Sequence, residues 1–175
     1  WQGQADKPVM RRIHTYDHEC YLCPGNERIG GQKNPQYSGP FVFDNDFSAI
    51  PSDIETQKHD EGLFQMRSES GICKVICFSE NHRTTIPEMS LEEVEAVINV
   101  WVQETCDMQQ QLNINHIQIF ENKGALMGCS NLHPHCQIWA QESVPDITAK
   151  ENRTQREYYR KRGKSLLEEY IIQEK

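Results

Sequence analysis

The stretch SNLHPHCQIW, residues 130–139, places two histidines and a glutamine at two-residue spacing. Pro134 disfavours helical backbone angles at the preceding residue, and a strand turns every second side chain to the same face. The stretch therefore predicts a strand that presents His133, His135 and Gln137 on one side. Cys136 would point to the opposite side and belong to the core. The alternative is a polar strand that carries its histidines by chance.

The side chains of this stretch suit phosphoryl chemistry. A neutral imidazole can attack phosphorus and form a covalent phosphoramidate, which a second nucleophile then breaks. The amide of Gln137 can donate a hydrogen bond to a phosphoryl oxygen as charge develops there, but it is a poor proton donor to a leaving group. A phosphate leaving group needs little protonation. The cluster therefore indicates transfer between phosphates rather than hydrolysis.

Cys20 and Cys23 form a C-x2-C pair in a loop rich in glycine and proline. This spacing lets two thiolates bind one tetrahedral Zn²⁺, which needs two more ligands. The candidates are the histidines of the chain: His14, His18, His59, His82, His116, His133 and His135. Two cysteines without a metal remain an alternative. A redox pair is a weaker one, because the CPGN segment does not look like a helix that starts after a strand.

Two further segments could bind a nucleotide. Asn45 and Asp46 end a predicted strand, where a carboxylate can accept hydrogen bonds from both hydroxyls of a ribose; an ordinary turn is the simpler interpretation. The segment 122–131 supplies Lys123, small residues and backbone N–H groups that suit a phosphate, or it is a plain loop. His82 alone is typical of an exposed loop histidine.

The elements that must position these residues follow from local patterns. Ser90 and Glu93 form a capping box, and an apolar stripe with helical spacing follows it to about Leu112. Gly163 should interrupt a charged helix that starts at Lys150, and the chain then continues as a helix or a strand. Loops are expected at 20–40 and 51–62. One strand is expected at the start of 41–50, two within 63–80 with a turn near Gly71, one at 116–124 and one at 135–141. We predict an α+β fold with an antiparallel sheet and one long crossover helix.

Composition limits the function further. The chain has 175 residues, a net charge of −8 and a pI of about 5.4, which argues against a nucleic-acid-binding surface. No apolar run approaches the roughly 20 residues of a membrane helix, and no signal peptide is visible at Trp1. Seven cysteines, an odd number, indicate a reducing and therefore cytoplasmic compartment rather than a disulfide scaffold.

Taken together, seven motifs resemble the galactose-1-phosphate uridylyltransferase family, in the branch of the histidine triad superfamily that has glutamine in place of the third histidine. They are WQGQ, CYLCPGN, NPQY, FVFDNDF, CKVICFS, QIFENKGALMGCSN and HPHCQIWA. The resemblance runs through nearly the whole chain and covers about the first half of a typical member. It implies a histidine-triad-like half-barrel and a single catalytic N-terminal domain, 1–175, with the C-terminal half absent. Leu132 departs from the proline that the family usually has there.

The resemblance also implies roles for individual residues. His135 would be the nucleophile, and Gln137 would stabilise the uridylylated intermediate. A closed, structural zinc site would consist of Cys20, Cys23, His82 and His133. Glu151 matches a ligand of a second metal site, zinc or iron, that some members carry. Nucleotide contacts would fall on Leu22, Ile29, Phe43, Asn45 and Asp46, and contacts near the phosphates on Asn122, Gly128, Ser130 and Gln137.

The implied reaction belongs to galactose metabolism. UMP would move from UDP-glucose to galactose 1-phosphate by double displacement through a uridylyl-histidine, in a homodimer. Two alternatives remain open at this point. One is a related phosphorylase or transferase that uses another nucleotide sugar, and the other is a zinc-stabilised nucleotide-binding fragment without activity.

Overall fold

The structure is a computed structural model that describes residues 14–55, 57–111, 113–129 and 131–174. The WQGQ motif, Leu112 and Ser130 lie outside these residues. The chain divides into two compact units, one up to Glu142 and one from Ser143 onward. The first unit holds the sheet and the second is helical, and each is described by itself below.

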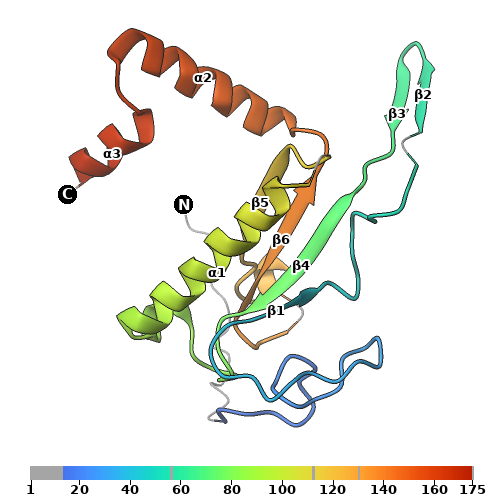
Figure 1. Cartoon of the computed structure of the whole chain (residues 1–175), viewed down its shortest axis with the longest axis vertical. Coiled ribbons are helices and arrows are strands. Elements are labelled where there is room, and N and C mark those ends of the chain that lie inside the picture. Colours follow the sequence, from blue (N-terminus) through green and yellow to red (C-terminus); the bar gives the residue numbers. More distant parts are fainter. Residues whose placement is uncertain (1–13, 56, 112, 130, 175) are drawn as a thin grey trace. The chain divides into compact units, whose positions relative to one another are not determined.

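The central element is an open antiparallel sheet of four strands, in the order β1-β4-β6-β5 (Figure 1). These strands are β1 (Phe41–Asp44), β4 (Gly71–Cys77), β5 (His116–Phe120) and β6 (His135–Gln141). Buried and half-buried residues alternate along β6, as expected for a strand with two different faces. The predicted α+β fold with an antiparallel sheet is therefore confirmed.

One face of the sheet is covered by α1 (Leu91–Gln109), which connects β4 to β5 and follows the short 3-10 helix Ile86–Glu88. The predicted capping box is present, because the Ser90 hydroxyl accepts from Glu93 N–H and the Glu93 carboxylate accepts from Ser90 N–H. The helix ends at Gln109, with Gln110 as C-cap, rather than near Leu112.

The core beneath α1 contains the buried residues Ile76, Phe78, Val97, Met108, Cys136, Ile138 and Ala140. Trp101 Nε1 donates to Cys136 Sγ across 3.3 Å, and Cys136 is 2% exposed. Cys136 is thus a core residue, as its place on β6 predicts. Burial raises the pKa of its thiol to about 12.

On the opposite face of the sheet, the loop 20–40 packs against the end of β4. Its buried cluster contains Cys20, Leu22, Cys23, Val75 and Cys77, with Tyr37, Phe41 and Phe43 packed against it. The loop contains no strand, only an isolated bridge between Glu27 and Lys33, in agreement with the prediction.

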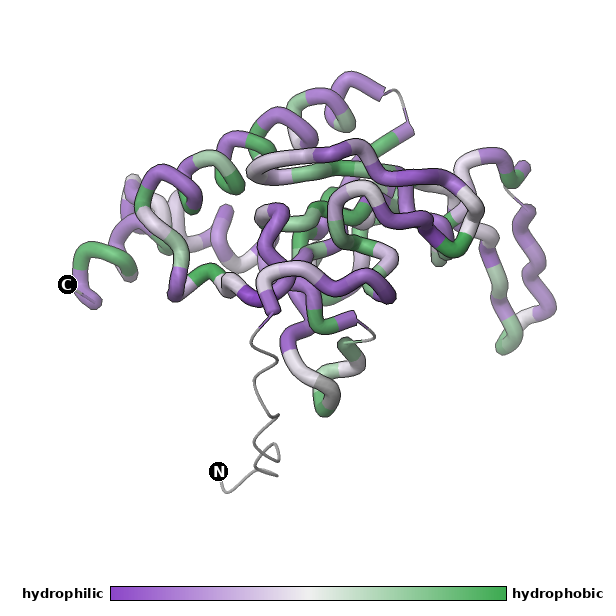
Figure 2. The backbone as a smooth tube through the Cα atoms, turned by 90° about the horizontal axis from the view of Figure 1, so that it is seen from below, coloured by the Kyte–Doolittle hydropathy of each residue, from purple (hydrophilic) through white to green (hydrophobic). Residues whose placement is uncertain are grey.

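The segment 51–62, predicted as a loop, contains a strand. This strand, β2 (Lys58–Glu61), pairs with β3 (Phe64–Arg67). The two strands predicted within 63–80 are confirmed as β3 and β4. Gly62 has φ +70°, which suits the two-residue turn between them. All eight strand residues are exposed, and the ribbon stands apart from the sheet in Figure 2. The sequence of β2 has no buried face, which is why periodicity did not reveal this strand.

The second unit consists of α2 (Asp146–Arg162) and α3 (Leu166–Glu174). Gly163 ends α2 with φ +68°, and its N–H donates to Tyr159 O, so the predicted interruption is confirmed. The chain continues as a helix, and α2 starts four residues before Lys150. Of the helices that the structure describes, none is long and apolar enough to cross a membrane.

Candidate metal site and active site

The amides of half-buried Asn26 and buried Asn34 hold the loop that carries the two cysteines of the C-x2-C pair. Asn26 Nδ2 donates to Asp17 O at 2.9 Å and to Cys20 O at 2.8 Å. Asn34 Nδ2 donates to Tyr21 O and Cys23 O. These bonds satisfy backbone carbonyls that no strand partner could reach. A loop without regular structure can therefore hold two thiols in fixed places.

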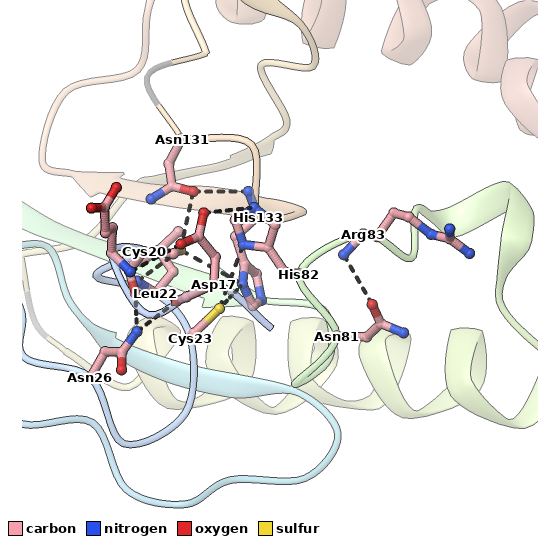
Figure 3. Close-up of polar contacts among 11 residues, drawn as sticks. Asp17, Cys20, Leu22, Cys23, Asn26, Asn81, His82, Arg83, Asn131 and His133 are labelled. Carbon is pink, nitrogen blue, oxygen red and sulfur yellow. Dashed lines mark hydrogen bonds and ion pairs between the residues drawn. The ribbon is translucent and has the colours of Figure 1, made fainter. Parts of the chain in front are cut away.

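The structure brings Cys20, Cys23, His82 and His133 together, all of them buried (Figure 3). One ligand atom from each lies within 4.8 Å of the others. Cys23 Sγ is 3.5 Å from Nδ1 of His82 and of His133, and Cys20 Sγ is 4.0 Å from His133 Nδ1. A tetrahedral zinc with ordinary bond lengths separates its sulfur and nitrogen ligands by about 3.6 Å. The four residues thus form a cluster able to hold one metal ion.

In both histidines Nε2 faces an oxygen outside the cluster, which leaves Nδ1 for a metal. His133 Nε2 is 2.9 Å from Ser79 O, so this nitrogen carries the proton and Nδ1 keeps its lone pair. His82 Nε2 lies 4.0 Å from Asp17 Oδ2. A metal-bound histidine usually donates its other ring N–H to a carbonyl or a carboxylate. The donor set therefore fits a metal, and the cluster is the only such group in the described part of the chain.

Burial sets the protonation of the metal-free cluster. It lowers the pKa of His133 to about 4, because burial disfavours the imidazolium, and raises the pKa of the Cys23 thiol to about 12. At neutral pH the metal-free His133 is thus a neutral imidazole and Cys23 a protonated thiol. A metal that binds here must displace the cysteine protons.

His135 lies on β6 with the opposite arrangement of its ring nitrogens. Its Nδ1–H donates to His133 O across 2.7 Å, so Nε2 keeps the lone pair. Of the three residues predicted to share a strand face, His135 and Gln137 do so on β6. The prediction is wrong for His133, which precedes β6 and lies in the metal cluster. Gln137 Oε1 accepts from Trp139 Nε1 at 3.2 Å, which leaves its amide N–H groups for another acceptor.

A pocket of about 350 Å³ lies beside His135. Its lining includes Asn122, a predicted phosphate contact, together with Lys123 and Arg83. Gly128, with φ +79°, directly precedes Cys129, which also lines the pocket. Glu88 and Glu121 also line the pocket, so its formal charges balance. A phosphate-bearing ligand would find Lys123, Arg83 and the imidazole lone pair as local partners in it.

The predicted nucleoside contacts gather on the same face of the sheet. Phe43 pairs with Val75, and Val75 pairs with Gln137, so the three side chains form one row across β1, β4 and β6. Phe43 and Gln137 are therefore two strand spacings, about 10 Å, apart. Asn45 and Asp46 follow β1, and the Leu22 side chain packs in the cluster that Phe43 also joins. Ile29 lies in the loop 20–40 and is exposed.

Of two further predicted residues, one is not described and the other belongs to the second unit. Ser130 lies outside the described residues. Glu151 lies on α2 in the second unit, where its side chain is exposed. The second metal site therefore stays a prediction.

Four residues at the site were missed by the sequence interpretation: Asp17 beside His82, Asn131, Arg83 and Arg28. Asn131 Oδ1 accepts from His133 N–H at 2.8 Å and from Cys20 Sγ at 3.5 Å. Arg28 contacts Phe43 and Asp46. Asn131 is the last residue of the motif QIFENKGALMGCSN, and Arg83 follows His82, so the sequence carried a signal for both. Nothing in the sequence marks Asp17 or Arg28, whose partners are distant in the chain.

The chain resembles known proteins over most of its length. Residues 1–145 match the model of a family described as galactose-1-phosphate uridyl transferase, N-terminal domain. The chain is 46% identical to galactose-1-phosphate uridylyltransferase of Haemophilus influenzae, over 99% of this chain and 50% of that protein. It is 45% identical to the enzyme of that name from Rattus norvegicus, over 99% of this chain and 46% of that protein. It thus spans about half the length of these relatives.

Solved structures share the fold. A uridylyltransferase structure has a TM-score of 0.71 at 21% identity, over 84% of this chain and 46% of that chain. An ADP-glucose phosphorylase from Arabidopsis thaliana with bound ADP-glucose has a TM-score of 0.66 at 20% identity, over 87% of this chain and 49% of that chain.

Proposed function

Because the chain belongs to the galactose-1-phosphate uridyl transferase family, we propose that it carries the nucleophile of an enzyme that moves UMP from UDP-glucose to galactose 1-phosphate. The products are UDP-galactose and glucose 1-phosphate. The observation that carries the proposal is the hydrogen bond from His135 Nδ1–H to His133 O, which leaves Nε2 with a lone pair beside the pocket.

The reaction proceeds in two displacements. His135 Nε2 attacks the α-phosphorus of UDP-glucose, the bond to the bridging oxygen breaks, and glucose 1-phosphate leaves with that electron pair. The Nδ1–H bond to the backbone stabilises the positive charge that the ring gains. A phosphate oxygen of galactose 1-phosphate then attacks the uridylyl-histidine, and His135 is released. The Gln137 amide donates to the phosphoryl oxygens in both steps.

The metal in the cluster is zinc in this proposal. Bound there, it supplies structural stability rather than chemistry, because four protein ligands close its coordination sphere. Cys20, Cys23 and His82 would fix His133, and the His133 carbonyl orients the nucleophile. The proposal also includes a single catalytic domain, 1–175, that pairs as a homodimer, and a second metal at Glu151.

The test is intact-protein mass spectrometry after the protein is mixed with UDP-glucose at neutral pH, because phosphoramidates are acid-labile. We expect a gain of one uridylyl group, and none in the His135→Ala variant. The variant should keep its metal and its thermal stability, since His135 is not a ligand. A labelled His135→Ala variant would contradict the assignment of the nucleophile.

The second candidate function is that of a phosphorylase or transferase of an adenine nucleotide sugar, because the fold is shared with an ADP-glucose phosphorylase. The same assay tests it. The two are separated by replacing UDP-glucose with ADP-glucose. An adenylyl gain larger than the uridylyl gain would favour a phosphorylase or transferase of the adenine nucleotide. Binding of UDP without any covalent gain would indicate a nucleotide-binding module.

A further inference from the structure

Arg28 is an arginine that the fold buries without using all of its donors. It lies in the loop 20–40, where its N–H donates to Gln32 O at 2.8 Å, and it is 8% exposed. Its Nη2 donates to Gln32 Oε1. Its Nε and Nη1 are buried and have no hydrogen-bond partner among the described residues.

The guanidinium of Arg28 contacts two residues that follow each other closely on and after β1. Its Cζ lies 4.2 Å from the centroid of the Phe43 ring, within cation–π distance. Its Nε lies 3.7 Å from Asp46 Oδ2, an ion pair that is too long to be a hydrogen bond. The loop passes directly beside the same carboxylate, since a Cβ on Gly30 would lie 3.5 Å from Asp46 Oδ1.

Fold stability alone explains this arrangement poorly. Removing a guanidinium from water costs several kcal/mol, and an ion pair offsets this cost only where its geometry is good. With two donors unused, an apolar side chain of similar volume would stabilise the loop at least as well. The contacts of Arg28 therefore indicate that it acts on Phe43 and Asp46 rather than stabilising the loop.

Phe43 and Asp46 are two of the predicted nucleoside contacts. The Phe43 ring stands in the row that leads through Val75 to Gln137, and Arg28 stacks on it. Asp46 has one oxygen toward Arg28, and its carboxylate can accept from the ribose hydroxyls. One side chain thus contacts both the base-binding ring and the ribose-binding carboxylate.

We propose that Arg28 is a positioning residue, which holds the Phe43 ring and the Asp46 carboxylate in the places where they contact the base and the ribose of the uridylyl donor. The inference rests on the proposed function. The planar guanidinium can stack on a ring and pair with a carboxylate at once, whereas the point charge of a lysine can do only one of these. Arg28→Lys should therefore keep the charge but lose the positioning.

The test compares affinities for UDP and for 2′-deoxy-UDP by isothermal titration calorimetry. In the unchanged protein UDP should bind more tightly, because both ribose hydroxyls are available to Asp46. Arg28→Lys and Arg28→Met should weaken UDP binding by about tenfold, the worth of a hydrogen bond to a charged group. They should weaken 2′-deoxy-UDP binding less, because the bond of the 2′-hydroxyl to Asp46 is already absent there, so that the ratio of the two affinities falls toward one.

The matched control is Arg67→Lys. Arg67 lies on β3 and pairs with Glu142 at 2.7 Å, so it is an ion-paired arginine that does not contact Phe43 or Asp46. This variant should keep the affinity for UDP and the ratio of the two affinities. Metal content and thermal unfolding are recorded for every variant.

The outcomes separate the two proposals. Arg28 variants with unchanged affinities, in a protein that binds UDP, would overturn the positioning role and leave the proposed function in place. An equal loss for both nucleotides would also overturn it, as would unfolding of both Arg28 variants with loss of metal. A protein that neither binds UDP nor is labelled by UDP-glucose would instead overturn the proposed function.

Discussion

The metal cluster and the pocket share the segment 133–135, yet they use its two histidines in opposite ways. His133 is fully buried and donates from Nε2 to Ser79 O, so that Nδ1 faces the cysteines. His135 is half-buried and donates from Nδ1 to His133 O, so that Nε2 is left for the pocket. In each case a backbone carbonyl decides which nitrogen keeps its lone pair. In the proposed function, the same type of side chain thus serves as a metal ligand or as a nucleophile, depending on its backbone partner.

The comparison predicts that the two regions can be disabled separately. The largest effect is expected for Cys23→Ser, which removes one of two thiol ligands from a buried site. Metal content should fall from one ion per chain to none, and the free energy of unfolding should fall by more than about 5 kcal/mol. Atomic emission analysis and thermal unfolding measure the two quantities.

The matched control for this prediction is Cys106→Ser. Cys106 is an exposed free cysteine on α1, so its replacement should change stability by less than about 0.5 kcal/mol and leave the metal in place. A Cys23→Ser variant that retains its metal would show that the cluster is not the metal site.

A smaller effect concerns pH and only the metal-free protein. The pKa of His133 is about 4 when folded, against an ordinary value of 6.5. Between these values the unfolded chain binds more protons, so the free energy of unfolding should decrease as pH falls from 6.5 to 4. The decrease from this group is at most about 3 kcal/mol, and above pH 6.5 it contributes no change.

Urea unfolding with a chelator at pH 7.5, 5.5 and 4.5 measures this slope. His133→Gln should flatten it, whereas replacing the exposed His59 by glutamine should leave it as it was. Equal slopes in all three proteins would mean that burial of His133 does not set the acid sensitivity.

The smallest effect is expected for Gln137→Leu, on the side of the pocket. It removes an amide that the proposal directs at the phosphoryl oxygens, so kcat should fall by about 100-fold, or about 2.7 kcal/mol. Metal content should not change, because Gln137 is not a ligand. Steady-state kinetics with UDP-glucose and galactose 1-phosphate measure the loss. An unchanged kcat would show that Gln137 acts only as the hydrogen-bond partner of Trp139.

Local patterns predicted the elements whose signal lies within a few residues. The capping box at Ser90 fixed the start of α1, and the alternation in HCQIWAQ matched the bounds of β6. Strand β2 was wrongly assigned to a loop because all its residues are exposed, so that no buried face imposes a pattern, whereas β3 and β4 lie where two strands were predicted.

The candidate site was predictable only where a motif carried it. Spacing alone proposed Cys20 and Cys23 but left seven histidines as partners, since His82 and His133 meet the cysteines through the fold. The resemblance to a family selected these two. Neither the motif spacing nor the resemblance predicted Arg28, because its burial against Phe43 and Asp46 depends on how the loop lies on β1.

The contacts of His133 with the cysteines have a consequence for the order of folding. Cys23 and His133 are 110 residues apart in the chain, and β4 meets β6 only after α1 and β5 have been made. Contacts of such long range form slowly, because the loop-closure entropy is lost before they stabilise the chain. Because of this separation, the cysteine loop leaves the ribosome long before His133 does during synthesis. Capture of the metal and alignment of the nucleophile then become one late event, completed when the segment 133–135 docks.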